Sequence, residues 1–265
     1  MSLLESILAT KRKEIDSLVS FPRGTRTPLA VLPVLRRGRL DPLRLIAEVK
    51  FRSPSAGALS RALDAAGRAL AYQRAGAAMV SVLCDGEFFD GGWDHLASVR
   101  WHLDRTGASI PVLAKEFVLH RAQVLRAHAA GADSVLLIAR IVEPTLLAEL
   151  VDVSRDLGME PLVEVADERE LDAALGAGAL LIGVNARDLD TLGMDEGRAA
   201  RVVEAIARDR VAVHLSGLRS AVDVARVATG RSDAALLGES LMRQEDPEPL
   251  LSTLVLAAGG VTWRG

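Results

Sequence analysis

Eight short, almost entirely apolar runs recur along the chain, separated by longer segments rich in Ala, Leu, Arg and Glu. Runs of this kind are typical of parallel strands that are covered on both faces, and the segments between them suit helices. Strand, helix and strand in regular alternation predict right-handed βαβ units, and eight such units predict a closed (β/α)8 barrel, the TIM-barrel architecture. The runs lie at 45–49, 79–83, 112–115, 134–138, 161–165, 180–185, 211–215 and 234–238.

An open, doubly wound α/β sheet is the structural alternative. Its Gly-rich signature, G-x-G-x-x-G, is absent after the first run, where residues 53–57 read Ser-Pro-Ser-Ala-Gly and predict a turn. The chain has 265 residues, 49% of them hydrophobic and 25% charged, which suits one globular barrel and argues against disorder. We therefore expect a single α/β barrel domain over 1–265, with no second domain.

The segment 1–43 precedes the first expected strand and is longer than a barrel needs. Residues 2–19 predict an amphipathic helix with apolar side chains close to one face, and Ser2 with Glu5 resembles a capping box. Prolines at 22, 28 and 33 then predict turns. We expect an N-terminal helical extension folded over one end of the barrel, with a loose arm as the alternative.

Charge and composition exclude several classes of function. A net charge of −3 does not suit a general nucleic-acid binder, and no apolar stretch is long enough to cross a bilayer. The N-terminus is too charged for a signal peptide, and Cys84 is the only cysteine, so we expect a cytoplasmic protein without an intrachain disulfide. The histidines lack metal-ligand spacing. Cys84 is expected to be a small buried residue, and His214 a packed or hydrogen-bonded one.

Charged and amide side chains gather at the carboxyl ends of the expected strands. Glu48 and Lys50 lie two residues apart in an extended segment, so they point to the same side. In a closed barrel the strand ends surround one cavity, and lysines next to other charges can transfer protons near neutral pH. Each residue alone suits a rim ion pair, but together they predict an active site. Phe88 and Phe89 suit either an apolar wall for an aromatic ligand or packing on the rim. The other strand-end residues are Lys115, Glu164, Asn185 and Arg187.

Glycines directly follow the seventh and eighth expected strands. Gly217 comes after Ser216, and Gly238 precedes Glu239, where a short helix is expected to begin. Backbone N–H groups exposed at these two places in a barrel predict a phosphate site. A simple turn is the alternative for each glycine taken singly.

Together these motifs resemble the indole-3-glycerol phosphate synthase family over essentially the whole chain. The most specific motif is Ile-Ala-Glu-Val-Lys at 46–50 with Ser-Pro-Ser at 53–55. Supporting motifs are Leu-Ala-Lys-Glu-Phe at 113–117, Gly-Val-Asn-Ala-Arg-Asp-Leu at 183–189 and Gly-Glu-Ser-Leu-Met at 238–242. The resemblance implies a carboxy-lyase of tryptophan biosynthesis. Its substrate would be 1-(2-carboxyphenylamino)-1-deoxyribulose 5-phosphate, and its products indole-3-glycerol phosphate, carbon dioxide and water.

The resemblance also implies roles for individual residues. Lys115 would be the general acid of ring closure, and Lys50 with Glu48 would serve the dehydration. Glu164 would be a further base or would orient Lys115. Asn185 completes the expected catalytic set, the expected substrate-binding residues are Ser53, Phe89, Arg187 and Ser216, and the expected phosphate-binding residues are Gly217, Gly238 and Glu239. The expected partner is a phosphorylated small molecule, without metal, cofactor, nucleic acid or membrane, and the expected state is a monomer or weak homodimer.

Three positions depart from the family's usual pattern. Leu215 stands where the family usually has Glu, Glu116 where it usually has Asp, and Cys84 where it often has Thr. The first change leaves two alternatives open: a paralogue of specialised indole metabolism, or a phosphate-binding barrel with reduced or no turnover. An enzyme like phosphoribosylanthranilate isomerase is disfavoured, because it would need a cysteine or aspartate pair where these strand ends offer lysines.

Overall fold

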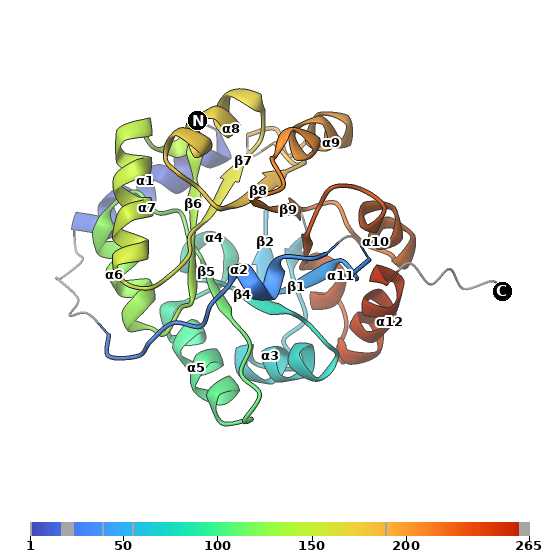
Figure 1. Cartoon of the computed structure of the whole chain (residues 1–265). Helices are drawn as coiled ribbons and strands as arrows, with labels where there is room; N and C mark the ends of the chain where they lie inside the picture. The colour runs from blue at the N-terminus through green and yellow to red at the C-terminus, as the bar shows by residue number, and fades with distance from the viewer. Residues whose placement is uncertain (1, 17–23, 39, 55, 189, 260–265) are drawn as a thin grey trace.

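The computed structural model describes residues 2–16, 24–38, 40–54, 56–188 and 190–259. Eight parallel strands form a closed ring in which the last strand pairs with the first (Figure 1). Closure sets Ala47 opposite both Val80 and Leu237. The expected (β/α)8 barrel is therefore confirmed, with each strand within one residue of its predicted bounds. The strands are β1 (Arg44–Val49), β4 (Met79–Leu83), β5 (Val112–Lys115), β6 (Ser134–Ile138), β7 (Leu162–Val165), β8 (Leu181–Asn185), β9 (Val211–Leu215) and β10 (Ala234–Leu237).

Helices alternate with the strands and surround the barrel (Figure 1). Gly76, Gly131 and Gly178 lie just past helix ends with φ of 93°, 94° and 75°, the left-handed conformation that glycine adopts without strain. The longer helices are α3 (Ala65–Arg74), α5 (Trp93–Asp104), α6 (Arg121–Ala129), α7 (Pro144–Asp156), α8 (Glu168–Gly176), α9 (Glu196–Ala205), α10 (Ala221–Ala228) and α12 (Glu248–Ala258). The short ones are α4 (Gly86–Phe89), the 3₁₀ turn η1 (Ala139–Ile141) and α11 (Glu239–Met242).

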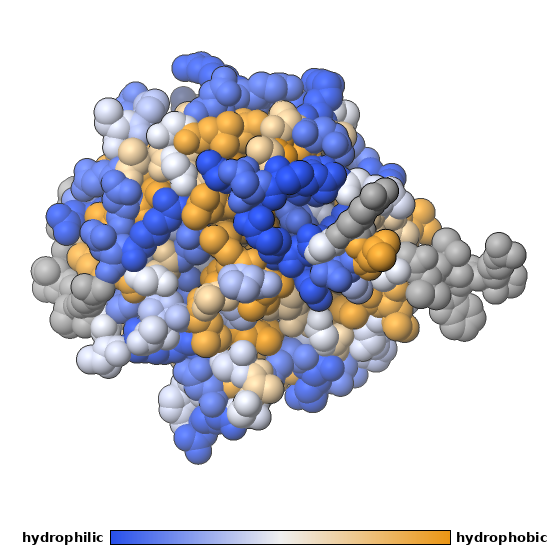
Figure 2. All heavy atoms as spheres, viewed as in Figure 1, coloured by the Kyte–Doolittle hydropathy of each residue, from blue (hydrophilic) through white to orange (hydrophobic). Residues whose placement is uncertain are grey.

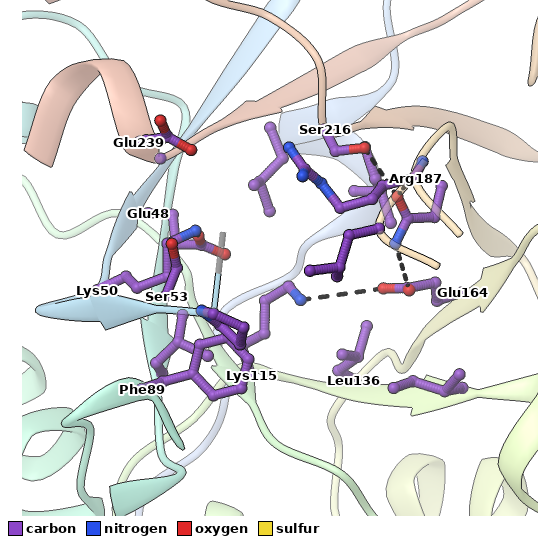
Figure 3. A pocket seen from close by; sticks show the side chains of 18 of the residues that line it. Glu48, Lys50, Ser53, Phe89, Lys115, Leu136, Glu164, Arg187, Ser216 and Glu239 are labelled. Atoms are coloured by element: carbon purple, nitrogen blue, oxygen red, sulfur yellow. Dashed lines mark hydrogen bonds and ion pairs between the residues drawn. The ribbon is translucent and has the colours of Figure 1, made fainter. Parts of the chain in front are cut away.

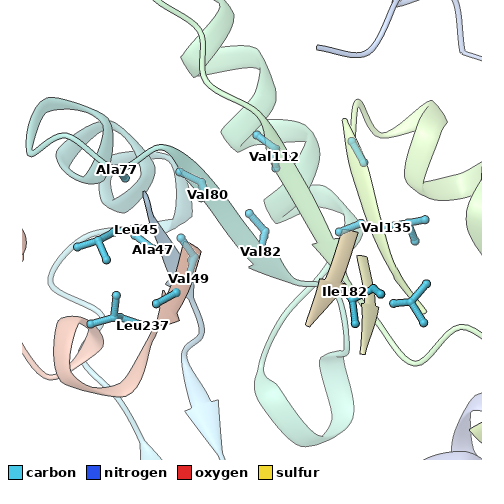
Figure 4. Close-up of a cluster of buried hydrophobic side chains, with 14 of the residues drawn as sticks. Leu45, Ala47, Val49, Ala77, Val80, Val82, Val112, Val135, Ile182 and Leu237 are labelled. Carbon is cyan, nitrogen blue, oxygen red and sulfur yellow. The ribbon is translucent and has the colours of Figure 1, made fainter. Parts of the chain in front are cut away.

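Two hydrophobic clusters lie on the two sides of the strands. The outer cluster fills the space between strands and helices and includes Val80, Val82 and Ile182 (Figure 4). The inner cluster fills the barrel and includes Ile46 and Leu113. Successive side chains of a strand point to opposite faces, so a strand buried on both sides must be apolar throughout. This explains the continuous apolar runs in the sequence.

The N-terminal extension begins with α1 (Leu3–Asp16), at the end of the barrel where the strands finish. The predicted capping box is present: the Ser2 backbone N–H donates to Glu5 Oε2 at 2.7 Å, and the Glu5 N–H donates to Ser2 Oγ at 3.2 Å. Leu4 and Ile7 join the inner cluster, so the expected apolar face packs on the barrel. The predicted end of this helix at residue 19 and Pro22 lie outside the described residues.

A second part of the extension crosses the opposite end of the barrel. Val31 and Leu35 pack into the inner cluster there, and α2 (Leu32–Leu35) lies across the middle of the ring in Figure 1. In the same view, hydrophobic side chains show at the centre of the face and hydrophilic ones gather around it (Figure 2). The extension thus covers both ends of the barrel, whereas the sequence predicted only one.

Two buried aspartates at the starts of strands hold this second part in place. Asp133 Oδ1 accepts the backbone N–H of Leu29 at 2.7 Å, and Asp233 Oδ1 accepts that of Arg37 at 3.5 Å. The second oxygen of each carboxylate accepts a backbone N–H from the preceding strand: Val112 at 2.8 Å for Asp133, and Ala212 at 2.9 Å for Asp233. Buried carboxylates need such partners, so these bonds join the extension to the barrel at two separate points.

The first loop of the barrel contains the predicted turn, with turn conformation at Pro54 and Ala56, but two short strands flank it. Strands β2 (Arg52–Ser53) and β3 (Gly57–Ala58) pair antiparallel within it, whereas the sequence indicated no antiparallel strands between βαβ units. Two-residue strands carry no alternating apolar pattern, which is why periodicity does not reveal them. Within the part of the chain that the structure describes, no helix is both long and apolar enough to span a membrane.

Val31 and Leu35 form a buried apolar plug at the start of the strands, and this plug predicts a stability effect. Leu35 is fully buried, so Leu35→Ala is expected to lower the free energy of unfolding by about 2–5 kcal/mol through the cavity it leaves. Urea unfolding followed by circular dichroism measures this. Leu40→Ala is the matched control, because Leu40 is 96% exposed and its truncation is expected to change the midpoint little. Equal urea midpoints for the two variants would contradict the prediction that Leu35 stabilises the barrel.

Candidate active site

One pocket opens at the end of the barrel where the strands finish. The expected site residues all line it, coming from six strand ends and from the loops that follow (Figure 3). The sequence therefore predicted correctly that these residues converge, although their roles stay predictions. They are Glu48, Lys50, Ser53, Phe89, Lys115, Glu164, Asn185, Arg187, Ser216, Gly217, Gly238 and Glu239.

Glu48 and Lys50 form an ion pair at the end of β1. Lys50 Nζ lies 2.5 Å from Glu48 Oε1, as their i, i+2 spacing in an extended segment allows. Burial alone would raise the pKa of Glu48, but Lys50 and Lys115 outweigh it and lower that pKa. Glu48 is therefore ionised at neutral pH. A Cβ at Gly238 would lie 2.5 Å from Glu48 Oε1, so glycine at this position makes room for the carboxylate.

A chain of polar side chains crosses the pocket from β5 to the loop after β9. Lys115 Nζ lies 3.9 Å from Glu164 Oε2, and Asn185 Nδ2 donates to Glu164 Oε1 at 2.8 Å (Figure 3). Asn185 Oδ1 accepts the Ser216 hydroxyl at 2.8 Å and the Arg187 backbone N–H at 2.9 Å. Glu164 Oε2 is buried and has no hydrogen-bond partner among the described residues. This oxygen faces Lys115 Nζ and can accept a hydrogen bond or a proton from it.

Apolar side chains form much of the rest of the pocket wall. The Phe89 and Phe117 rings lie with centroids 6.0 Å apart, and both line the pocket. Phe89 thus lies where an apolar wall for a ligand was expected, and its contact with Phe117 equally suits packing on the rim, so its role as a substrate-binding residue stays a prediction. Leu215 lines the pocket while remaining 2% exposed. A Cβ on Gly183 would lie 2.7 Å from Leu215 Cδ1, so the leucine fills the space above this glycine.

Helix α1 supplies a wall that the strand ends do not. Leu3, Leu4 and Ile7 line the pocket. The sequence indicated an apolar face on this helix, but not which surface it covers. An apolar stripe says only that a face is buried, so no sequence signal pointed to the pocket.

Lys11 of α1 is the centre of a buried group of charges next to the pocket. Its Nζ lies 2.7 Å from Asp85 Oδ2, 3.1 Å from Glu116 Oε1 and 2.9 Å from Glu14 Oε2. Burial would lower the pKa of Lys11, but Glu116 and Asp85 outweigh it and raise that pKa above its usual range. Glu116 therefore pairs with the N-terminal extension.

Glu116 itself carries a perturbed carboxyl group. Burial is the largest effect and raises its pKa to about 7, although Lys11 and the backbone N–H of Phe117 lower it. A group near half-protonation at neutral pH makes this charge cluster sensitive to pH.

The loop after β8 is held by a second set of charges outside the pocket. Arg140 contacts Asp188 Oδ2 at 3.2 Å and Glu170 Oε1 at 2.8 Å. The backbone N–H of Thr191 and the Arg140 guanidinium outweigh burial and lower the pKa of Asp188 to about 2. The loop that carries Arg187 is thereby fixed next to the pocket.

The remaining candidates behave as packed residues. Cys84 is buried, and burial raises the pKa of its thiol well above the usual value. His214 is buried too, and burial lowers its pKa. Among the described residues, no three His, Cys, Asp or Glu side chains are arranged to hold a metal ion.

Comparison with known proteins decides the family. The model of the family described as indole-3-glycerol phosphate synthase matches residues 4–254. The chain belongs to the indole-3-glycerol phosphate synthase family. A relative of that name from Mycobacteroides abscessus is 39% identical over 258 residues, covering 97% of this chain and 93% of the relative. Another from Rhodopirellula baltica is 40% identical over 253 residues, covering 93% and 96%.

Solved structures support the fold of this family member. Tryptophan synthase from M. tuberculosis matches with a TM-score of 0.63 at 15% identity, covering 88% of this chain and 99% of the other. Phosphoribosylanthranilate isomerase from Thermotoga maritima matches with a TM-score of 0.58 at 14% identity, covering 83% and 100%. Identities this low show a shared barrel and nothing about the reaction.

The family motifs also left several pocket residues unidentified. Arg219 follows the Ser-Gly pair after β9 and lines the pocket, as do Leu192 of the β8 loop and Leu236 of β10. The position of Arg219 two residues after Gly217 is a signal that the sequence offered.

The perturbed carboxyl of Glu116 predicts a pH-dependent stability. Its pKa is raised from 4.5 to about 7, so its stabilising contribution is complete below pH 4.5 and is lost as the pH rises through 7. Relative to Glu116→Gln, the wild type is expected to lose on the order of 1–3 kcal/mol of unfolding free energy between pH 4.5 and 8. Urea unfolding at several pH values measures this.

Glu14→Gln is the control, because Glu14 contacts the same lysine from a side chain that is 45% exposed. This variant is expected to keep the pH dependence of the wild type. Parallel stability curves for the wild type and Glu116→Gln would contradict the assignment to Glu116.

Proposed function

We propose that the pocket carries out the indole-3-glycerol phosphate synthase reaction with two lysine–carboxylate pairs. The observation that carries this proposal is that Lys50–Glu48 and Lys115–Glu164 open onto one partly apolar pocket. As a member of this family, the chain is a carboxy-lyase of tryptophan biosynthesis. The substrate is 1-(2-carboxyphenylamino)-1-deoxyribulose 5-phosphate, and the products are indole-3-glycerol phosphate, carbon dioxide and water.

Ring closure needs an acid at the substrate's ketone. The Lys115 ammonium protonates the ketone oxygen while the ring carbon bearing the carboxylate attacks the carbonyl carbon, which forms the new C–C bond. The Glu164 carboxylate stabilises the charged form of Lys115 before the transfer, since its free Oε2 faces the ammonium at 3.9 Å, and the lysine regains its proton from solvent after the step. Asn185 holds the other carboxylate oxygen at 2.8 Å and so keeps Glu164 turned toward Lys115.

Decarboxylation and dehydration complete the reaction. When the bond to carbon dioxide breaks, its electrons return to the six-membered ring and restore that ring's aromaticity. The hydroxyl formed in the first step then departs as water with a proton from Lys50, and a carboxylate removes the proton that completes the indole. Glu48 is the base nearest Lys50 and is ionised, as this step requires. Glu164 is the alternative base.

The ends of the substrate match the two sides of the pocket. The aromatic ring packs against the apolar wall that includes Phe89, close to Ser53. The ammonium of Lys50 attracts the ring carboxylate, and Arg187 with Ser216 holds the hydroxyls of the chain. The phosphate lies at the turns of Gly217 and Gly238, near the backbone of Glu239. Ser216 and Gly217 have φ of 66° and 85°, a conformation that turns their backbone sharply beside the pocket.

The partner is thus a phosphorylated small molecule. The monomeric or weakly dimeric state, the cytoplasmic location and the reading of 1–265 as a single domain stay predictions. A mass measurement by light scattering tests the first of these.

Leu215 favours a second candidate, a related barrel of specialised indole metabolism or one with weak turnover. The leucine replaces a charge with an apolar wall inside the pocket. The two candidates differ in rate on the same substrate, so an assay that follows indole fluorescence separates them. Turnover typical of an enzyme, about 1 per second or faster, favours the main proposal.

Removing the proposed acid tests the mechanism. Lys115→Ala is expected to lower kcat by about 10²–10⁴-fold, because general acid catalysis contributes factors of that size. The variant is expected to fold, because Lys115 is the last residue of β5 and its side chain borders the pocket. Indole fluorescence gives kcat, and circular dichroism checks folding. Lys13→Ala, at an exposed position of α1, is the control with expected wild-type turnover. Near-normal kcat in Lys115→Ala would refute the assignment.

Leu215→Glu tests the meaning of the replaced charge. The variant is expected to fold, because residue 215 borders the pocket, and to shift the pH–rate profile by adding a carboxylate near the two lysines. Leu215→Gln is the matched control: it has nearly the same shape without the charge and is expected to leave the profile in place. Unfolding of both variants would assign Leu215 to the core alone.

A further inference from the structure

Arg219 extends its side chain at the rim of the pocket, in the loop between Gly217 and α10. We propose that its guanidinium is a phosphate ligand, which makes Arg219 a residue that determines specificity for the phosphorylated substrate. This proposal rests on the proposed function, because it assigns a residue to the phosphate end of the same site.

The backbone of Arg219 is fixed from both sides. Leu218 is 5% exposed and packs in the outer cluster, so it anchors the chain immediately before Arg219. The Arg219 N–H donates to Asp223 Oδ2 at 3.0 Å, and the same oxygen accepts the Ser220 N–H at 2.9 Å in a capping box. A side chain on such a fixed base loses less conformational freedom when it binds a ligand.

The carboxylates near Arg219 form their ion pairs with other cations. Asp223 binds backbone N–H groups, and its ion-pair partner is Arg226, at 3.9 Å. Glu239 also lines the pocket, but its Oε1 pairs with Arg243 at 2.9 Å. Within the described residues, no hydrogen bond or ion pair involves the Arg219 side chain. Its charge is therefore available to an anion.

The neighbouring groups suit a phosphate at this position. Gly217, Gly238 and Arg219 line the same pocket, so a phosphate bound at the two glycine turns lies in the pocket that the arginine also borders. Burial alone would raise the pKa of Glu239, but Arg243, Arg219 and Lys50 outweigh it and lower that pKa. Glu239 is thus anionic, and a phosphate dianion beside it needs an additional cation. Arginine supplies it and can bind two phosphate oxygens at once.

Arg187 is the other guanidinium of the pocket, and it takes a different part of the substrate. Its backbone N–H is bound to Asn185 Oδ1 at 2.9 Å, so it is fixed beside the chain of polar groups that faces the reacting atoms. The two arginines thus divide the substrate: Arg187 lies at the reacting portion, and Arg219 at the phosphate.

Steady-state kinetics of Arg219→Met test the proposal. We expect KM to rise about tenfold or more while kcat stays within about threefold, since one charge-assisted hydrogen bond to a bound group is lost. Arg219→Lys is expected to restore part of the affinity. Arg201→Met is the matched control, because it removes the same charge from an exposed side chain of α9 that pairs with Glu168 at 3.8 Å and does not line the pocket. Its KM is expected to match that of the wild type.

The dephosphorylated substrate separates a phosphate contact from a structural role. If Arg219 binds the phosphate, the wild type and Arg219→Met are expected to have equal kcat/KM on this compound. An equal loss on both substrates, or an unchanged KM on the phosphorylated one, would overturn the proposal. If the wild type turns over neither compound, the proposed function fails. Titration with inorganic phosphate then decides whether Arg219 binds a phosphate group. Weaker phosphate binding by Arg219→Met than by Arg201→Met supports the phosphate contact, and equal binding refutes it.

Discussion

Pairing of carboxylates inside an apolar barrel is the constraint on which the active site depends. Glu48 and Glu164 are each 3% exposed, and a carboxylate so far from water is costly unless cations or donors satisfy it. Lys50 pairs with the first, and Lys115 with Asn185 surrounds the second. The lysines that stabilise the buried carboxylates are therefore also the proposed proton donors. Stability and chemistry draw on the same contacts, so closure of the ring that brings β1, β5 and β7 together is a condition for both.

Much of the fold and of the site could be predicted because the information was local. A strand buried on both faces must be apolar throughout, and this marked all eight strands to within one residue. Spacing alone placed Glu48 and Lys50 on one side of β1, and Ser2 with Glu5 at the start of α1. Once the strands were known to close, their carboxyl ends had to share one rim. The convergence of the pocket residues follows from that geometry.

What the sequence did not reveal depends on contacts between distant segments. Lys11 meets Glu116 across 105 positions, and nothing near either residue in the sequence specifies the other. The apolar stripe of α1 gave burial without a partner surface, so its place over the pocket stayed hidden. The sequence predicted that Gly238 forms a phosphate-binding turn, and only the structure shows that a side chain there would collide with Glu48. Each case needs the third dimension, because the physical cause lies on another strand or helix.

The extension that spans both ends of the barrel also constrains how the molecule is made. Arg37 precedes its partner Asp233 by 196 residues, and Asp233 lies next to the strand that closes the ring. Leu35 likewise packs in an inner cluster that includes Ala234 and Leu236 of β10, so its native surroundings are incomplete until that strand has been added. During synthesis, residues 31–37 are therefore made well before the strand that completes their contacts.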